Sequence, residues 1–215
     1  MTGVTITRAA KRVRLAPEAR RAQLIALGVE MLATRRLEEL SVELIAKTAG
    51  ISRGLLFHYF SSKQEFHLEV ARAAAAEMLR RTEADPALSP VEALRSALTS
   101  FVDYVEENPD NYRSLVRGAI SGDDQMRAIF DGTRRAMAQR IIDVVADQGL
   151  AVQPRVALAI SGWIAYVEEC VVRWLDERTV SRDELLEMLT RSLPAVAAAA
   201  TDGEVGTLLA VLTGA

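Results

Sequence analysis

The spacing between two short helical segments constrains this chain more than any other feature of its sequence. Residues 42–49 and 53–60 are each about eight residues long, and the turn Gly50–Ser52 separates them. A glycine readily ends a helix and a serine begins one, so this turn is well suited to joining two helices. Helices this short are not stable alone, so we expect them to pack on a preceding helix over 17–35. The pattern predicts a helix-turn-helix. Its seam can be formed by Leu44, Ile45, Ala49, Leu56 and Phe60.

The rest of the chain also has the pattern of helices. Ala, Leu, Arg and Glu are abundant, Pro occurs only 6 times, and no stretch alternates like a strand. Ser62, Ser89 and Ser181 are each followed three residues later by Glu, the capping-box pattern that begins a helix. We predict an all-α fold of nine or ten helices. After the first three, the predicted helices begin after Ser62, cover 90–107, 110–119, 124–148 and 155–176, and begin after Ser181, with Pro194 kinking or ending the last and a short apolar helix in 201–215 as a possible tenth.

Charge is distributed unevenly along the chain. The net charge is -3, but residues 1–65 hold 11 Lys/Arg against 6 Asp/Glu, while residues 66–215 hold 15 against 23. A basic end on an acidic body indicates contact with a polyanion, although charge alone leaves a chance fluctuation open. We predict a flexible basic arm over 1–16, a helix-turn-helix domain over 17–65, and a sensing and dimerising body over 66–215.

Several protein classes are disfavoured. No run of about 18 apolar residues lacks charges, and the first residues lack the apolar stretch of a secretory signal, so we expect no membrane segment. The lone Cys170 allows no internal disulfide, which favours the reducing cytoplasm. His58 and His67, the only histidines, are nine residues apart and cannot share a helix face as metal ligands. We therefore expect neither enzyme activity nor a bound metal or cofactor.

The outward positions of the second short helix suit the reading of DNA bases. An α-helix fits the major groove, and residues of its first turn reach base edges. Arg53 can donate two hydrogen bonds to guanine, a pairing that discriminates between bases by about 1–3 kcal/mol. Gly54 lets the backbone approach, Leu55 or Phe57 can touch a thymine methyl group, and His58 can donate or accept a hydrogen bond.

The flanking residues suit phosphates. Ser41 and Ser52 begin helices whose free N–H groups attract anions. Lys63 is a positive charge at a helix start, which is unfavourable unless an anion lies nearby, and Tyr59 offers a hydroxyl. The alternative is that this corner only packs the first three helices together. The basic balance of the region and the two bases, Arg53 and Lys63, favour DNA binding.

The segment SVELIAKTAGISRGLLFHYFSSKQEF resembles the DNA-binding segment of the TetR (tetracycline-repressor) family of bacterial regulators. The resemblance covers about 45 residues, from the first predicted helix into the fourth, and the rest of the chain has only a compatible helix count. The residues that match the family pattern are Ile45-Ala46, Ala49-Gly50-Ile51-Ser52, Gly54, Leu56, Phe60 and Ser62-Lys63.

This resemblance implies an all-α homodimer whose first three helices bind double-stranded DNA. It directs Arg53, Gly54, Leu55 and His58 to the major groove and Ser41, Ser52, Phe57, Tyr59 and Lys63 to phosphates. The chain departs from the family where Leu55 replaces a frequent threonine, Phe57 a usual tyrosine and His58 a frequent aromatic residue. The first two changes remove hydroxyls, so the phosphate contact at Phe57 is in doubt and Tyr59 is the substitute.

The predicted body can hold an effector, pair with a second copy, or serve only as core. An adaptable pocket for a small, largely apolar effector uses aromatic and methionine side chains. The candidates for it are Phe101, Tyr104, Tyr112, Met126, Phe130, Met137, Trp163 and Tyr166. The candidates for the dimer interface are Trp163, Val167, Cys170, Val171, Trp174, Leu185, Leu186 and Leu189.

The function that these features favour is ligand-responsive transcriptional regulation. The chain is expected to act as a repressor that binds a pseudo-palindromic operator as a homodimer and is released by a small-molecule effector. The alternative is a DNA-binding regulator of the same fold that is controlled by a protein partner or by its own concentration.

Overall fold

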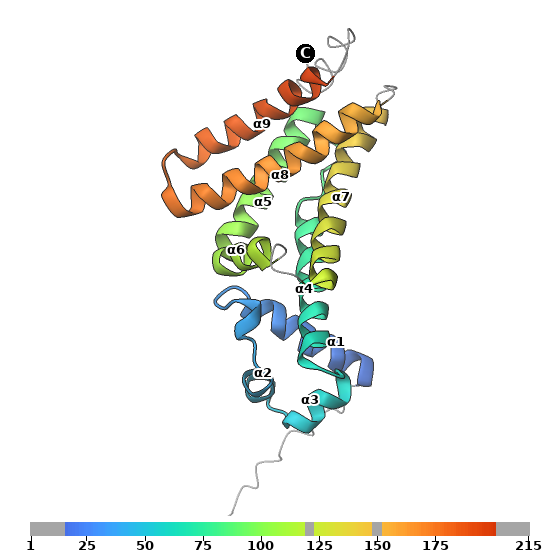
Figure 1. Ribbon diagram of the computed structural model, residues 1–215, viewed down its shortest axis with the longest axis vertical. Coiled ribbons are helices and arrows are strands. Elements are labelled where there is room, and N and C mark those ends of the chain that lie inside the picture. The colour runs from blue at the N-terminus through green and yellow to red at the C-terminus, as the bar shows by residue number, and fades with distance from the viewer. Residues whose placement is uncertain (1–15, 119–122, 148–151, 201–215) are drawn as a thin grey trace, which may run out of the picture.

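The computed structural model describes residues 16–118, 123–147 and 152–200, and in this part of the chain all regular secondary structure is helical. Figure 1 shows an elongated molecule with α2 and α3 at one end and α8 and α9 at the other. The helices are α1 (Pro17–Met31), the 3-10 helix η1 (Leu37–Glu39), α2 (Val42–Ala49), α3 (Arg53–Tyr59), α4 (Lys63–Arg81), α5 (Pro90–Glu107), α6 (Pro109–Gly118), α7 (Asp124–Asp147), α8 (Pro154–Glu177) and α9 (Arg182–Ala199). The predicted all-α fold is confirmed.

No described helix is long and apolar enough to cross a membrane. Apart from Ala16, the predicted basic arm lies outside the described residues, as does 201–215.

The predicted helix starts follow from local chemistry. Ser41, Ser52 and Ser62 each accept a hydrogen bond from the backbone N–H three residues on, as do Ser89 and Ser181. The last two serines form complete capping boxes with a glutamate, as the sequence predicts. The box predicted at Ser62 is only half formed, because the Glu65 carboxylate accepts from the N–H and hydroxyl of Ser61 instead, both at 2.6 Å.

One sequence prediction about a helix end was wrong, and of the two outcomes predicted at Pro194, a kink or an end of the helix, the end does not occur. The first helix ends at Met31 instead of reaching residue 35, and η1 follows it. Leu37 and Leu40 explain the break, because the chain must leave the helix direction to bury both in the core. The last helix continues through Pro194 to Ala199. Burial of Leu193 and Ala197, which lie one turn apart, holds the final turns in place despite the missing proline N–H.

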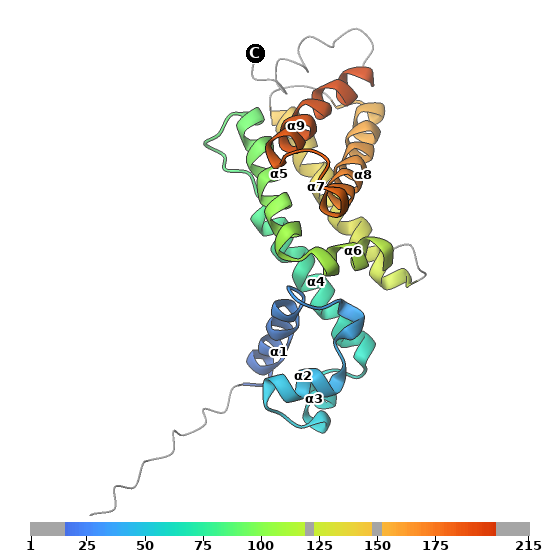
Figure 2. The ribbon, with the colours of Figure 1, turned by 90° about the vertical axis from the view of Figure 1, so that its left-hand side faces the viewer.

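Two hydrophobic cores share one helix. The core of the end that carries α1–α3 includes Phe66, Val70 and Ala74 of α4, and the core of the body includes Met78 of the same helix. Met126 of α7 also packs, half-buried, on the first core. Figure 2 shows α4 running from one end of the molecule into the body. The boundary predicted between residues 65 and 66 therefore falls in the first turn of a helix that serves both cores, and it stays a prediction.

Side chains of α4 also hold the segment between α1 and α2. The His67 ring is buried, and its Nε2 lies 2.9 Å from the backbone carbonyl of Leu40. Burial lowers the pKa of His67, so the neutral ring donates through Nε2. The Lys63 ammonium donates to the carbonyl of Glu38 at 3.1 Å. These two bonds fix η1, and with it the start of α2, against the shared helix.

The contact between α1 and α4 depends on Gly28. A Cβ atom at residue 28 would lie 2.4 Å from Val70 Cγ2 and 3.0 Å from Phe66 Cζ. Both neighbours belong to α4 and are themselves buried, so neither can move freely aside. The absence of a side chain at Gly28 therefore sets how closely the first helix approaches the shared helix.

We predict that Gly28→Ala lowers the free energy of unfolding by about 1–3 kcal/mol, because overpacking in a filled core costs that much. Adding Val70→Ala removes the clashing methyl groups. The double variant should therefore lose less unfolding free energy than the two single variants lose when their losses are added. Urea unfolding measures all three. Gly132→Ala in α7 is the control, since a Cβ there meets nothing within 4 Å. Additive effects would contradict the close approach.

Candidate nucleic-acid interface

The turn between α2 and α3 has the geometry that its sequence predicts. Gly50 adopts a left-handed conformation, with φ 64°, and the N–H of Ile51 donates to the carbonyl of Ala46 at 2.9 Å. Glycine reaches this backbone region without steric cost, whereas other residues are strained there. Ser52 then caps α3 through a 3.1 Å bond from the N–H of Leu55. The turn thus fixes the angle between the two short helices.

One face of α3 is anchored and the opposite face is open. Leu56 is 3% exposed and Phe60, just beyond the helix, is 2% exposed, so both are buried in the first core. Leu55 and Phe57 are 38% and 46% exposed, which is unusual for large apolar side chains without a partner. The other exposed residues on this short helix are Arg53, Gly54 and His58, while Tyr59 is half-buried. All five residues predicted to read bases therefore lie on the open surface.

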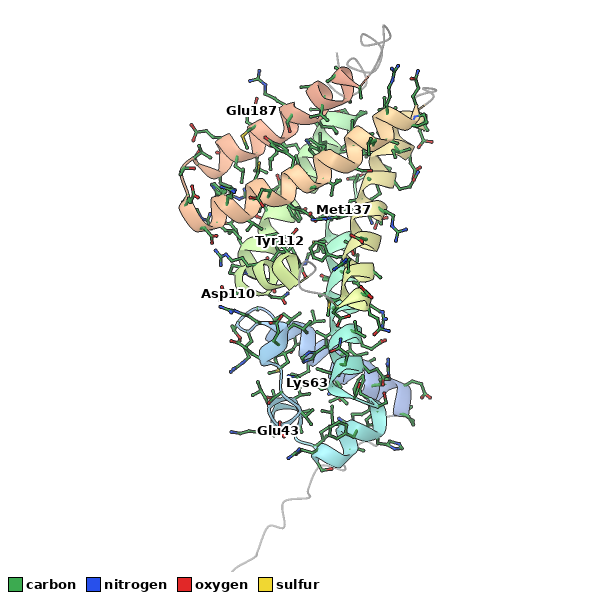
Figure 3. All side chains as sticks on the ribbon, in the orientation of Figure 1. Glu43, Lys63, Asp110, Tyr112, Met137 and Glu187 are labelled. Carbon is green, nitrogen blue, oxygen red and sulfur yellow. The ribbon has the colours of Figure 1, made fainter. Side chains whose placement is uncertain are left out.

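An ion pair that the sequence does not predict spans the two helices. Nη2 of Arg53 lies 3.0 Å from Oε1 of Glu43, in the first turn of α2, and both side chains are more than half exposed. An exposed pair of this kind contributes about 0–1 kcal/mol, so DNA can displace it at little cost. Glu43 is ten residues from Arg53 in sequence, and only the turn brings the two together. Figure 3 shows Glu43 at this end of the molecule.

Three of the predicted phosphate ligands also have structural roles. The hydroxyls of Ser41 and Ser52 accept hydrogen bonds as helix caps, but a hydroxyl can still donate to a phosphate oxygen. The Lys63 ammonium uses one donor on the carbonyl of Glu38 and keeps two. This bond gives a second reason for a lysine at the start of α4. The role of these residues on DNA stays a prediction.

The basic character of this end comes mainly from its first residues. Residues 17–65 carry seven Lys/Arg and six Asp/Glu, so they are almost neutral, while residues 1–16 carry four bases and no acid. Non-specific attraction to DNA grows with the number of phosphates that are neutralised. Residues 17–65 therefore add little to this non-specific attraction, and the first 16 residues carry most of the surplus positive charge of this end.

The residues predicted to line an effector pocket fall around two cavities. The larger has a volume of about 130 Å³ and lies between α5, α7, α8 and α9, with Phe101, Met137 and Trp163 in its wall. The smaller, of about 30 Å³, lies between α4, α6 and α7, and Tyr104, Tyr112, Met126 and Phe130 line it. Tyr166 lies at neither cavity and is 39% exposed on α8. Glu168, for which the sequence leaves open polar specificity in the pocket or a surface charge, is buried and lines both cavities.

Most residues predicted for the dimer interface are buried within a single chain. Cys170 is half-buried, and the other seven are part of the body's core, where α8 packs on α9. The indole of Trp163 donates to Ser192 and that of Trp174 to the carbonyl of Val180. The exposed positions of α8 instead include Leu158, Ser161, Gly162, Ala165 and Tyr166. Whether copies pair, and through which surface, stays a prediction.

Comparisons with known proteins match both ends of the chain. A family model described as "Bacterial regulatory proteins, tetR family" matches residues 24–70, and one described as "Tetracyclin repressor-like, C-terminal domain" matches residues 90–196. HTH-type transcriptional activator FasR of Mycolicibacterium smegmatis is 26% identical over 81% of both chains. HTH-type transcriptional repressor KstR2 of the same species is 35% identical over 42% of this chain and 45% of its own.

A solved structure has the same architecture. The crystal structure of a tetR-family transcriptional regulator from Streptomyces coelicolor superposes with a TM-score of 0.79 at 28% identity, and the match covers 93% of this chain and 90% of that one. The likeness therefore extends over both cores.

Gly54 provides a test of the interface that is independent of folding. A Cβ at this position would meet only Ser52 Oγ, at 4.0 Å, so neither packing nor backbone conformation requires glycine. We predict that Gly54→Ala keeps the stability of the chain or raises it by up to about 1 kcal/mol, because alanine favours helix. Its affinity for specific DNA should fall, because the added methyl group holds the backbone away from the groove.

Urea unfolding and fluorescence anisotropy with labelled DNA measure the two effects. Gly132→Ala, which adds the same methyl group to an open position of α7, should leave DNA binding unchanged. Undiminished DNA affinity in Gly54→Ala would show that this face does not approach DNA closely.

Proposed function

The chain belongs to the TetR family of transcriptional regulators, and we propose that it is a cytoplasmic homodimeric repressor that a small, largely apolar effector releases from a pseudo-palindromic operator. DNA binding and transcriptional regulation are properties of the family, and the chain is not an enzyme. The proposal adds the dimer, the operator symmetry, the direction of regulation and the effector.

The open face of α3 is the observation that carries the proposal. Arg53 stands at the first position of the helix, with Leu55 and Phe57 exposed beside it and Gly54 uncrowded. This combination suits direct reading of bases, with arginine on guanine and apolar side chains on thymine methyl groups. Because Phe57 has no hydroxyl, it suits an apolar contact better than a phosphate contact. The half-buried Tyr59 is the nearest side chain with a phenol hydroxyl.

The outer face of α8 supports a dimer. Leu158 is 74% exposed, and Ser161, Gly162 and Ala165 follow it at the spacing of one helix face. Small residues let two helices approach closely, and the exposed leucine adds apolar area to the same face, which suits contact with a second copy of the chain. Two copies joined through this face would carry two α3 helices to grooves about 34–36 Å apart, which explains a pseudo-palindromic operator.

Effector release needs two states of the dimer that differ in the spacing of α3. An effector that converts 99:1 occupancy of one state to 1:99 must prefer the second state by about 5.5 kcal/mol. The shared helix α4 supports such a link, because Ala74 lies both in the first core and in the wall of the smaller cavity. The two cavities favour control by a ligand over control by concentration or by a protein partner.

The sign of regulation is the least constrained part of the proposal. FasR is named an activator and KstR2 a repressor. Repression needs only that the dimer occupy DNA and block access to it, without a further surface for recruiting polymerase. We therefore retain repression as the proposal.

We predict that Arg53→Ala lowers affinity for the operator about 5- to 150-fold, the equivalent of about 1–3 kcal/mol, and lowers affinity for random DNA much less. A footprint on DNA upstream of the gene and its neighbours would supply the operator, and anisotropy titrations would compare the two DNAs. Arg95→Ala, which breaks a similar exposed ion pair with Glu187 in the body, is the control. Equal losses on both DNAs would contradict base reading.

For the dimer, we predict that Ala165→Arg yields a monomer in analytical ultracentrifugation, because a charged side chain at the centre of the stripe separates the helices. Operator affinity should fall with it, since a monomer contacts one half-site. The matched control is Ala76→Arg on the exposed side of α4, which should remain dimeric. If the Ala165→Arg protein is still a dimer, the interface does not use this face of α8.

A further inference from the structure

The wall between the two cavities holds a buried carboxylate. Glu168 of α8 is 5% exposed and lines both the larger and the smaller cavity. Its partner Arg134 lies over the ring of Phe130, and both guanidinium contacts, at 2.6 and 2.5 Å, use the same oxygen, Oε2. Burial raises the pKa of Glu168 and Arg134 opposes that rise. The Oε1 atom is left without a contact to the arginine.

A second polar group lies within reach of this carboxylate. Tyr112 of α6 is 2% exposed and lines the smaller cavity, and its hydroxyl interacts with Glu168 but meets no described atom in full hydrogen-bond geometry. Burial, and then the charge of Glu168, raise the pKa of Tyr112 well above its usual value, so the phenol keeps its proton. A buried hydroxyl without a full hydrogen bond is costly, and native proteins rarely keep one without a use. Figure 3 labels Tyr112 and Met137 in the body of the molecule.

We infer that the effector is an apolar molecule with one uncharged hydroxyl, whose body fills the larger cavity and whose hydroxyl binds between Glu168 and Tyr112. A hydroxyl accepts from the phenol and donates to the carboxylate at the same time, which satisfies both groups. The smaller cavity, at about 30 Å³, has room for such a group. The larger, at about 130 Å³, is close to the size of a cavity that admits benzene, so it suits about six carbon atoms.

The same geometry disfavours an anionic effector. A carboxylate has no donor for Glu168 and would set two negative charges side by side in an apolar wall. The base that lines the larger cavity, Arg140, already donates to the carbonyl of Leu79 at 2.7 Å and to the hydroxyl of Thr82 at 3.3 Å. These bonds tie it to the carboxyl end of α4, where a cation is stabilised by the helix dipole. Arg140 therefore has a structural role that needs no ligand.

This inference rests on the proposed effector control, and its test does not need DNA. Isothermal titration calorimetry would compare 1-hexanol, hexylammonium and hexanoate, which share one six-carbon chain, on the full-length protein. We expect hexanol to bind at least about tenfold more tightly than hexanoate. Tyr112→Phe should weaken hexanol binding about 3- to 10-fold, which is the usual scale for one lost hydrogen bond. It should leave stability to urea unchanged or higher, because the lost hydroxyl makes no full hydrogen bond in the free protein.

The role of the Glu168 carboxylate is tested with one variant at Glu168 and a control variant at its neighbour, Glu169. Glu168→Gln should reduce the preference for hexanol over hexanoate, because it removes the buried charge and keeps the volume. Glu169→Gln makes the same change one residue on, at an exposed position paired with Arg173, and should leave the preference intact. Unequal stability of the two variants would not affect this ratio of ligand affinities.

Other outcomes would overturn the inference. Tightest binding of hexanoate would assign the larger cavity to anions, and tightest binding of hexylammonium would make charge pairing with Glu168 the basis of selection. A destabilised Tyr112→Phe that binds hexanol normally would make the tyrosine a core residue. If no probe binds while the operator is still bound, the hydroxyl site fails and the DNA-binding function stands. Loss of operator binding alone would contradict the proposed function instead.

Discussion

The packing of α1 against α4 is the contact on which both ends of this molecule depend. Gly28 has no side chain, so Val70 and Phe66 of α4 can lie close against the backbone of α1, where a Cβ atom would clash with them. The same helix then continues through Ala74 to Met78, from the first core into the second. Since a close-packed interior transmits displacement instead of absorbing it, α4 can link the position of the helix-turn-helix to events in the body.

The DNA-binding end combines a rigid frame with an almost neutral folded surface. Capping serines, the left-handed Gly50 and the bonds from Lys63 and His67 to backbone carbonyls fix α2, α3 and η1. The exposed face of α3 is consequently held by groups that do not themselves have to read bases. The pair between Arg53 and Glu43 is weak and exposed, so it can orient the guanidinium without competing strongly with DNA.

The body buries several polar side chains, and two of them, Glu168 and Tyr112, line its cavities. A buried carboxylate and a phenol without a full hydrogen bond are costly in a core that could have been filled with leucine and valine. Their position at the junction of two cavities, next to α4 residues of the first core, connects recognition with the helix that reaches the DNA-binding end. The proposed effector would give both groups a hydrogen-bond partner.

The sequence by itself determined the features that short-range chemistry controls. Serine caps, the Gly50 turn and helical periodicity involve residues within about four positions of one another, so the helix starts and the helix-turn-helix follow from the chain directly. The sequence could not determine which apolar faces of α8 and α9 are covered within one chain. Trp163 and Leu189 have the same pattern as an interface and prove to be core.

The tertiary structure alone decided the arrangement of groups that are distant in sequence. The pair of Arg53 with Glu43, the end of α1 at Met31, and the meeting of Tyr112 with Glu168 each depend on how helices cross. Helical periodicity assigns a residue to the buried side of its helix, but it does not identify the residue of another helix that it contacts. Close packing supplies that neighbour, because only one arrangement of whole helices fills the interior without clashes or voids.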